Sequence, residues 1–332
     1  MLILGIDTSC DDTCAAVIRD EFEVCSSVVS SQDEVHGPFG GVVPELASRK
    51  HVESIIPIMD HALGSARATL AEIDLIAVTQ GPGLIGSLVV GISAAKAVSL
   101  AMDIPLVGVN HLEGHIVSSF LLAEPPRYPF VALVVSGGHT NLYVAKSAGN
   151  YTLMGQTLDD AAGEAFDKVA KLLGIGYPGG RAVEATARAC RETPIAFVRP
   201  YVKKGDLNFS FSGLKTAVRN FVAAHDRLDP PLIGRIAKGF EETIVSVLVE
   251  KTLALAERES IETVVVTGGV AANGRLRQEM EARARERGIM ALIPPKHLCT
   301  DNAAMIAAVG KVRASEASTD NLEMNAISRW MI

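Results

Sequence analysis

The sequence predicts an α/β protein with two lobes, in which each lobe is a mixed β-sheet flanked by helices. Two apolar strands joined by a polar turn occur within residues 2–18, and the same pattern returns within residues 130–145. After each hairpin, helices alternate with short buried strands, which is the order typical of α/β folds. A length of 332 residues also suits about two domains, since domains usually hold ~100–200 residues.

In the first lobe, the polar turn "DTSCDDT" separates apolar strands at residues 2–6 and 15–18. Apolar residues then recur at helical spacing or in short continuous runs, which predicts further helices and strands. The helices are expected at 44–63 and 84–102, and the strands at 73–80 and 104–110.

In the second lobe, the turn "SGGHT" separates strands at residues 130–135 and 141–145. Later helices are expected at 158–174, 233–259, 273–288 and 300–313, with a strand at 263–269. Prolines at positions 125, 126 and 129 cannot continue a helix and indicate a linker. We therefore expect a first lobe at 1–123, a linker at 124–129, a second lobe at 130–299, and a C-terminal helix and tail at 300–332 that packs towards the first lobe.

The composition indicates an enzyme-sized globular protein of the cytoplasm. Hydrophobic residues make up 48 % of the chain, and 31 basic against 38 acidic side chains give a net charge of −7. The overall charge therefore does not attract nucleic acid or an anionic membrane. The five cysteines are scattered and no secretory signal is evident, which favours a reducing compartment. The most apolar segment, 84–102, contains Lys96, so we expect a core helix there and no membrane.

The string "GPGLIG" at 81–86 fits the glycine pattern of dinucleotide sites, but its context does not. Such sites need an acidic residue at the end of the next strand, and that strand ends in Asn110, with Asp103 before it. Ile92 stands where a phosphate P-loop requires lysine. Glycines that permit close packing of a helix on a strand explain this segment better than a nicotinamide or flavin site.

Three turns are better placed to bind phosphate. The two hairpin turns present backbone N–H groups and hydroxyls, and Gly137 and Gly138 permit close approach in the second turn. A third turn, "TGGVAAN" at 267–273, precedes a helix whose free N–H groups favour an anion. Together the turns indicate a nucleotide cleft of the actin, Hsp70 and sugar-kinase type. An ATP-dependent phosphotransferase or ATPase is therefore one candidate function.

The string "NHLEGH" predicts a metal site. His111 and His115 are four residues apart and project from one face of a helix, as two ligands of one transition-metal ion would. In H-E-x-x-H peptidases the glutamate lies about 100° around the helix from the first histidine, whereas Glu113 lies about 200° away. A metallopeptidase is therefore the least favoured function, and Glu113 is expected at solvent or between the lobes.

Nine strings spread over the chain are long or unusual enough to be specific together. They are "GIDTSCDDT", "GGVVPELASRKH", "QGPGLIGSLVVG", "NHLEGH", "VSGGHT", "DDAAGEAFDKVAKLLGIGYPGG", "FSFSGLKT", "GGVAAN" and "CTDNAAMIA". In this order they resemble the motifs of the tRNA N6-adenosine threonylcarbamoyltransferase family, in its bacterial form. The resemblance implies an acyltransferase that moves a threonylcarbamoyl group from threonylcarbamoyl-AMP to the N6 amine of the adenosine beside the anticodon, in tRNAs that read codons beginning with A. AMP is released.

The resemblance also implies site residues. Asp301 joins His111 and His115 around one divalent metal ion per subunit, with iron favoured and zinc as the alternative. The residues implied for the phosphate and threonylcarbamoyl part are Val134, Val135, Ser136, Gly137, Gly138 and His139. Those implied for the nucleoside are Asp167, Gly180, Glu184 and Asn273. For two of these a plain structural role is the alternative: a helix-surface charge at Asp167 and an N-cap at Asn273.

A base is expected near the acceptor, because the lone pair of the N6 amine is delocalised into the adenine ring and the amine is a weak nucleophile. Asp11 and Asp12 in the first turn are the candidate bases, with His139 as the second choice. The family string has glutamate where Asp7 and Asp12 stand, so each side chain is one methylene shorter here.

Few basic residues gather along the sequence to meet tRNA. The modest clusters are Arg49–Lys50–His51, Lys203–Lys204 and Lys215, while the arginines at 275–287 alternate with glutamates as on a solvated helix face. We therefore expect partner proteins to supply part of the phosphate-binding surface. The resemblance implies that these partners are a paralogous actin-like subunit and a small P-loop ATPase.

Overall fold

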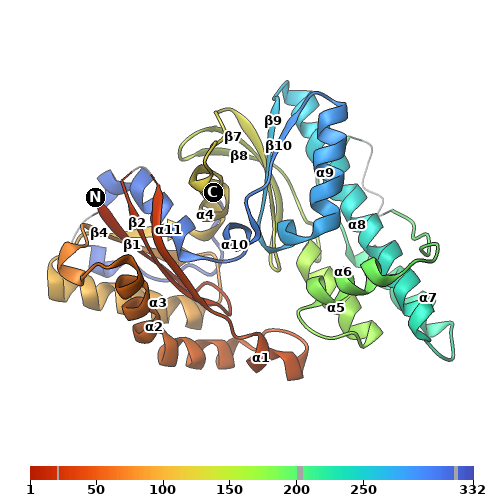
Figure 1. The fold of residues 1–332 in the computed structure, drawn as a ribbon, viewed down its shortest axis with the longest axis horizontal. Helices are drawn as coiled ribbons and strands as arrows, with labels where there is room; N and C mark the ends of the chain where they lie inside the picture. Colours follow the sequence, from red (N-terminus) through yellow and green to blue (C-terminus); the bar gives the residue numbers. More distant parts are fainter. Residues whose placement is uncertain (21, 200–204, 318–320) are drawn as a thin grey trace. The chain divides into compact units, whose positions relative to one another are not determined.

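The structure is a computed structural model that describes residues 1–20, 22–199, 205–317 and 321–332. The chain divides into two compact units (Figure 1). Unit 1 is Met1–Pro125 together with Asp301–Ile332, and unit 2 is Pro126–Thr300. The linker bounds stay a prediction, and the predicted basic cluster Lys203–Lys204 lies outside the described residues.

Unit 1 is built on a five-stranded mixed sheet. Its strands are β1 (Leu2–Asp7), β2 (Thr13–Arg19), β3 (Glu23–Ser30), β4 (Leu75–Gly81) and β5 (Leu106–Asn110). The order is β3-β2-β1-β4-β5, in which the first three strands form an antiparallel meander and β4 and β5 run parallel to β1. Nearly all residues of β1 and β4 are buried, as expected for central strands with helices on both faces.

Helices cover both faces of this sheet. They are α2 (Pro44–Ala66), α3 (Ile85–Met102), α4 (His111–Val117) and α11 (Ala303–Val312), with the short α1 (Asp33–His36) and the 3-10 turns Gly37–Phe39, Leu70–Glu72, Ser118–Leu121, Ala314–Glu316 and Asn321–Glu323. Alternate side chains of β1 enter two cores: Leu4 and Ile6 pack with α2 and α3, whereas Ile3 packs with α11. At Gly5 a Cβ would stand 2.2 Å from the carbonyl oxygen of Ala303, so glycine is required where α11 crosses β1.

The helix α3 is long and apolar enough to cross a membrane by length and composition alone. Within unit 1 it packs on β4 and α2, and Leu88 and Ile92 lie in the core. This packing is the one expected for the predicted core helix.

Unit 2 repeats the sheet of unit 1. Its strands are β6 (Phe130–Val135), β7 (Thr140–Ser147), β8 (Asn150–Gln156), β9 (Thr263–Thr267) and β10 (Met290–Leu292). The order is β10-β9-β6-β7-β8, again with an antiparallel meander and two strands parallel to its first member. Two mixed sheets of one topology, flanked by helices, confirm the predicted actin, Hsp70 and sugar-kinase-like fold class.

The helices of unit 2 build one large core against this sheet. They are α5 (Ala162–Leu173), α6 (Gly179–Ala189), α7 (Ser212–Ala223), α8 (Pro230–Glu259), α9 (Gly274–Glu286) and α10 (Lys296–Cys299), with a 3-10 turn at Gly269–Ala272. The rings of Phe166 in α5 and Phe240 in α8 meet edge to face with their centroids 5.3 Å apart. Both rings are buried beside Leu133 of β6, so the core joins helices distant in sequence.

Several elements differ from those predicted. The sequence patterns did not predict β3, β8, β10, α6 and α7. The helix predicted at 300–313 begins at Ala303, because the side chain of Asn302 accepts the N–H of Met305 at 3.0 Å and caps the first turn. The helix predicted at 158–174 begins at Ala162.

Candidate functional site

The two histidines of "NHLEGH" lie in the first turn and a half of α4. Asn110 ends β5, and its side-chain oxygen accepts the N–H groups of Leu112 at 2.9 Å and Glu113 at 3.4 Å. This cap starts the helix at His111, so the ring of His115 follows one turn later on the same face. The two ring centroids are 4.7 Å apart.

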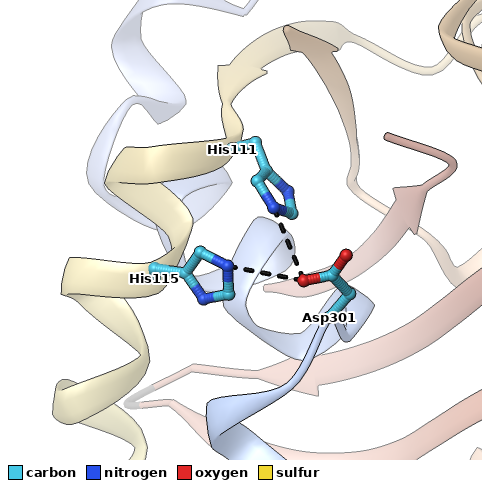
Figure 2. Close-up of side chains that lie close together, drawn as sticks. All are labelled: His111, His115 and Asp301. Carbon is cyan, nitrogen blue, oxygen red and sulfur yellow. Dashed lines mark ion pairs between the residues drawn. The ribbon is translucent and has the colours of Figure 1, made fainter. Parts of the chain in front are cut away.

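Asp301 faces both histidines from the segment just before α11 (Figure 2). Its Oδ1 lies 3.5 Å from Nε2 of His111 and 3.4 Å from Nε2 of His115. One ligand atom from each residue falls within 4.8 Å of the others. The structure thus brings together the three residues that the resemblance implied, in a group that could hold a metal ion.

The charges around this group are strongly coupled. Burial disfavours the charged ring of His111, but Asp7 and Asp301 outweigh burial and raise the pKa of His111 to about 10. Burial would also raise the pKa of Asp301, but the two histidines lower it well below its usual range. Burial and the neighbouring His111 lower the pKa of His115.

The donor set fits a transition-metal ion. Both ring nitrogens of His115 are buried and have no hydrogen-bond partner among the described residues, which is costly unless a ligand satisfies one of them. Oδ2 of Asp7 and Nδ1 of His111 also lack hydrogen bonds within the described chain, but they face each other at 3.4 Å. Asp7 is therefore placed to hold a proton on Nδ1 of His111 and leave Nε2 for a metal, as carboxylates behind metal-binding histidines do.

Glu113 differs from its prediction. It is 4 % exposed, so it is not a solvent contact, and its Oε2 lies 3.7 Å from Nη1 of Arg313. Both residues belong to unit 1, and a contact of Glu113 between the lobes stays a prediction. Arg313 follows α11, which lies beside α4, and this packing could not be predicted from the local string.

The turn that carries Asp11 and Asp12 is held at both ends by one buried imidazole. His51 of α2 has Nδ1 2.8 Å from the hydroxyl of Thr13 and Nε2 3.0 Å from the carbonyl oxygen of Cys10. Burial lowers the pKa of His51, so the neutral ring donates from Nε2 to Cys10 and accepts from Thr13 at Nδ1. We call this pair of contacts the His51 bridge.

The two carboxyl groups of this turn are less acidic than usual. Burial is the main cause for both, and the nearby Asp301 adds to it. The pKa of Asp11 is raised, and the pKa of Asp12 is raised to about 8. A group that ionises as close to neutrality as Asp12 does is suited to proton transfer.

In unit 2, the turn between β6 and β7 forms an open cradle of main-chain groups. Ser136 N–H donates to the carbonyl of His139 at 2.8 Å, and His139 N–H donates to the hydroxyl of Ser136 at 3.2 Å. Gly137 and Gly138 are exposed, and their N–H groups donate to no atom in the part of the chain that the structure describes. A Cβ at either glycine would meet nothing within 4 Å. The cradle therefore has the donors and the space for an anion.

Val134 and Val135 are fully buried, main chain included, so neither residue exposes any surface. The turn after β9 lies against this main chain. At Gly268, with φ +94°, a Cβ would stand 2.4 Å from the carbonyl oxygen of Val135. The carboxyl ends of β6 and β9 are thus adjacent, and ligands of α/β sheets bind at such ends.

The residues predicted for the nucleoside already have partners within unit 2. Asp167 accepts the N–H of Gly179 at 2.8 Å and Glu184 accepts the N–H of Gly274 at 3.0 Å. Asn273 accepts the N–H of Leu276 at 2.9 Å, which confirms the N-cap alternative. Its Nδ2 donates to Glu241 at 2.7 Å. Gly180 follows Gly179 in the first turn of α6, where a Cβ would meet nothing within 4 Å.

The sequence did not predict the contacts of three residues in these networks. Asp7 ends β1 and had only its departure from the family string as a signal. His51 was grouped with Arg49 and Lys50 as a basic cluster, but it is fully buried and burial lowers its pKa, so that grouping was wrong. Glu241 lies inside the apolar face of α8, where a buried glutamate was the signal that a partner must exist.

Comparison with known proteins gives the family. The tRNA N6-adenosine threonylcarbamoyltransferase family model matches residues 23–308. The protein of that name from Syntrophus aciditrophicus is 51 % identical over 334 residues, covering 99 % of this chain and 97 % of that protein. The one from Geobacter metallireducens is 51 % identical over 331 residues, with the same two coverages of 99 % and 97 %.

Among solved structures, full-length HypF in its phosphate- and nucleotide-bound form has a TM-score of 0.60 at 14 % identity, covering 98 % of this chain and 56 % of that one. The activator of the 2-hydroxyisocaproyl-CoA dehydratase from Clostridium difficile, with bound ADPNP, has a TM-score of 0.54 at 14 % identity, covering 97 % and 96 %. Identities this low show the fold alone. The matches in sequence show more: this chain belongs to the tRNA N6-adenosine threonylcarbamoyltransferase family.

Proposed function

We propose that the protein transfers a threonylcarbamoyl group from threonylcarbamoyl-AMP to the N6 amine of the adenosine next to the anticodon, in tRNAs that read codons beginning with A. AMP leaves in the same reaction. The observation that carries the proposal is 51 % identity over 99 % of the chain to a protein of that name. An ATP-dependent phosphotransferase would share the fold, but that activity gives no reason for a buried group of two histidines and an aspartate.

His111, His115 and Asp301 are proposed to bind one divalent metal ion, with Fe²⁺ favoured and Zn²⁺ as the alternative. Their two imidazoles and one carboxylate are ligands that either ion accepts. When bound, such an ion supplies Lewis acidity toward a carbonyl or phosphate oxygen of the donor. Asp7 orients the ring of His111 through the 3.4 Å contact between Oδ2 and Nδ1.

The glycine cradle of unit 2 is proposed to bind the phosphate and threonylcarbamoyl part of the donor. The free N–H groups of Gly137 and Gly138 supply donors, and the hydroxyl of Ser136 is held in place by the N–H of His139. Asp167, Glu184 and Asn273 are proposed to contact the nucleoside beside Gly180, with the carboxylates accepting from ribose hydroxyls.

Asp12, with Asp11 beside it, is proposed as the base for the N6 amine. The amine becomes acidic only as it attacks, so the base must take a proton from a group that is nearly positive at that moment. A carboxyl group with a pKa of about 8 holds a proton more strongly than an ordinary aspartate does. The His51 bridge fixes the main chain on both sides of this carboxyl group, because it joins Cys10 and Thr13.

The protein is proposed to act in the cytoplasm with a paralogous actin-like subunit and a small P-loop ATPase. The net charge of −7 supports the need for partners, since a polyanionic tRNA gains nothing from the overall field of this chain.

The test is the complete reaction. Purified protein, its partners, threonylcarbamoyl-AMP and unmodified tRNA are incubated, and the nuclease digest of the tRNA is searched for threonylcarbamoyladenosine by mass spectrometry. We expect product from the wild type and almost none from His111→Ala/His115→Ala, which should also lose its bound metal by elemental analysis. The control His61→Ala/His225→Ala removes two exposed histidines outside the site and should change neither measurement. No product from the wild type, or undiminished product from the first variant, would overturn the proposal.

A further inference from the structure

We propose that a basic surface on unit 2, formed by Arg188, Arg191, Arg235 and Lys238, binds the phosphodiester backbone of the RNA substrate. We call it the α6–α8 patch. Two of its residues come from the end of α6 and the segment after it, and two from the first half of α8. The proposal rests on the proposed function only for the identity of the RNA.

Main-chain packing brings the two halves of the patch together. The segment after α6 runs along α8: Ile195 N–H donates to the carbonyl of Arg235 at 3.1 Å. A Cβ at Gly234 would stand 3.1 Å from the side chain of Cys190, so the start of this segment also touches α8. Residues 188–191 and 235–238 are therefore neighbours in space although more than forty positions separate them in sequence.

The cations of the patch are poorly neutralised. Arg235 Nε donates to the carbonyl of Thr193 at 3.0 Å, and Lys238 Nζ donates to the carbonyl of Glu192 at 3.3 Å. These contacts fix the side chains without cancelling their charge. The carboxylate of Glu192 lies 3.8 Å from Arg235, and Arg188 and Arg191 are exposed and form no ion pair with any described residue.

The cations of the predicted basic clusters that the structure describes do form ion pairs. Arg49 pairs with Glu45 at 2.7 Å and Lys50 with Glu53 at 2.9 Å, and Lys215 pairs with Asp160. In the described chain, the four cations of the patch form one ion pair within 4 Å, that of Arg235 with Glu192. RNA backbones bind such local concentrations of positive charge, because each contact releases condensed counterions.

The test uses Arg188→Ala/Arg191→Ala, which leaves in place the two residues whose side chains hold main-chain carbonyls. The control is Arg258→Ala/Arg287→Ala, which removes the same charge from arginines that pair with Glu259 at 3.1 Å and Glu257 at 3.5 Å. A second comparison, Arg188→Lys/Arg191→Lys, keeps the charge. In the complete reaction, KM for tRNA and KM for the acyl donor are measured at 50, 100 and 200 mM salt. Filter retention of tRNA by the same complex is measured without the donor.

We expect the alanine pair to raise KM for tRNA and the dissociation constant about tenfold at 100 mM salt, with KM for the donor unchanged. The slope of log affinity against log salt should become shallower by about 0.7–0.9 for each lost contact. The lysine pair should stay within about twofold of the wild type, and the control should do so as well.

An unchanged slope and KM for tRNA would overturn the proposal, as would an equal effect in the control. If the alanine pair loses a partner subunit from the complex but retains tRNA as the wild type does, the patch binds an acidic protein surface instead. That result would also overturn the proposal. Because retention needs neither donor nor metal, this result is independent of whether the proposed transfer reaction occurs. Thermal unfolding of each variant shows whether any loss comes from misfolding.

Discussion

The substitution Glu241→Gln tests how much a buried acid beside the proposed nucleoside residues destabilises unit 2. Glu241 is 5 % exposed, and its Oε1 accepts the amide hydrogen of Asn273 at 2.7 Å. Burial raises the pKa of Glu241 to about 7, against the hydrogen bond from Asn273 and with help from the negative Glu184. Glutamine keeps an oxygen that accepts from Asn273 but cannot ionise.

The size of the expected change in stability follows from the pKa of Glu241 in the native and the unfolded states. In the unfolded chain the group ionises near 4.5, so between pH 4.5 and about 7 the native state holds a proton that the unfolded state has lost. Stability from this group is complete below pH 4.5 and is lost as the pH rises through about 7. At 1.36 kcal/mol per pH unit, the loss is at most about 3 kcal/mol at pH 8, and relaxation around the charge reduces it. We expect Glu241→Gln to recover about 2 kcal/mol at pH 8 and little at pH 5.

Thermal unfolding at several pH values measures this difference. For a unit of this size, about 2 kcal/mol corresponds to a rise in Tm of roughly 4–8 °C, which should be present at pH 8 and nearly absent at pH 5. The matched control is Glu242→Gln at the next residue in α8, which is only partly buried, and we expect no rise in Tm from it at pH 8. KM for the acyl donor should stay close to the wild-type value, because Asn273 keeps its partner. An equal change in Tm at pH 5 and pH 8 would refute the argument.

Three further substitutions probe the site. His51→Ala removes both buried hydrogen bonds of the His51 bridge and should lower the free energy of unfolding, measured in urea, by about 2–4 kcal/mol. We also expect kcat to fall by a larger factor than KM rises. A purely structural role would leave kcat per folded molecule unchanged. At Gly268 the main chain has a φ of +94°, and the Cβ of an alanine would stand 2.4 Å from a carbonyl oxygen. Gly268→Ala should therefore lower the free energy of unfolding by about 1–3 kcal/mol or more. The control Gly269→Ala, with open space around its Cβ, should not. Asp7→Asn should weaken metal binding about 10–100-fold in a direct metal titration, since the charge behind His111 is lost; undiminished affinity would contradict that role.

The fold class could be predicted because the strands of both hairpins, and the helices and strands that alternate after them, contain strongly apolar runs. The strands that were missed lie at or near the sheet edges and carry mixed patterns. β3 has exposed Val24 and Val29 beside serines, and β10 has only three residues. Such strands exist because a neighbour pairs with them, and their own sequence gives little signal.

The site was predictable where its geometry is local. The spacing of His111 and His115 within one helix predicts two ligands on one face, and the structure places them so. Asp301 lies almost two hundred positions away, and no local pattern connects it to them; only the resemblance did. Glu113 was misplaced for the same reason, because its partner Arg313 comes from an equally distant segment.

For the basic residues, the local sequence predicted sites that the structure does not support. Runs such as Arg49–Lys50 look like sites for a polyanion in the sequence, but the helix places a glutamate three or four residues from each cation. A net positive surface instead requires two segments whose acidic residues point elsewhere. In the α6–α8 patch, packing brings together cations from two segments, which a count of neighbouring residues along the chain does not detect.

The repeated sheet places two hairpin turns at equivalent positions, and their chemistry has diverged. In unit 1, residues 8–12 include two carboxyl groups with raised pKa values, and the His51 bridge holds the turn closed. In unit 2, residues 136–139 include no carboxyl group, and two exposed glycines offer free N–H groups. Main-chain N–H groups attract a phosphate, whereas carboxyl groups carry no positive charge to attract one and repel it once they ionise. We therefore expect the donor phosphate on the second turn, which leaves the first free for proton transfer, and this division is the one that the proposed reaction requires.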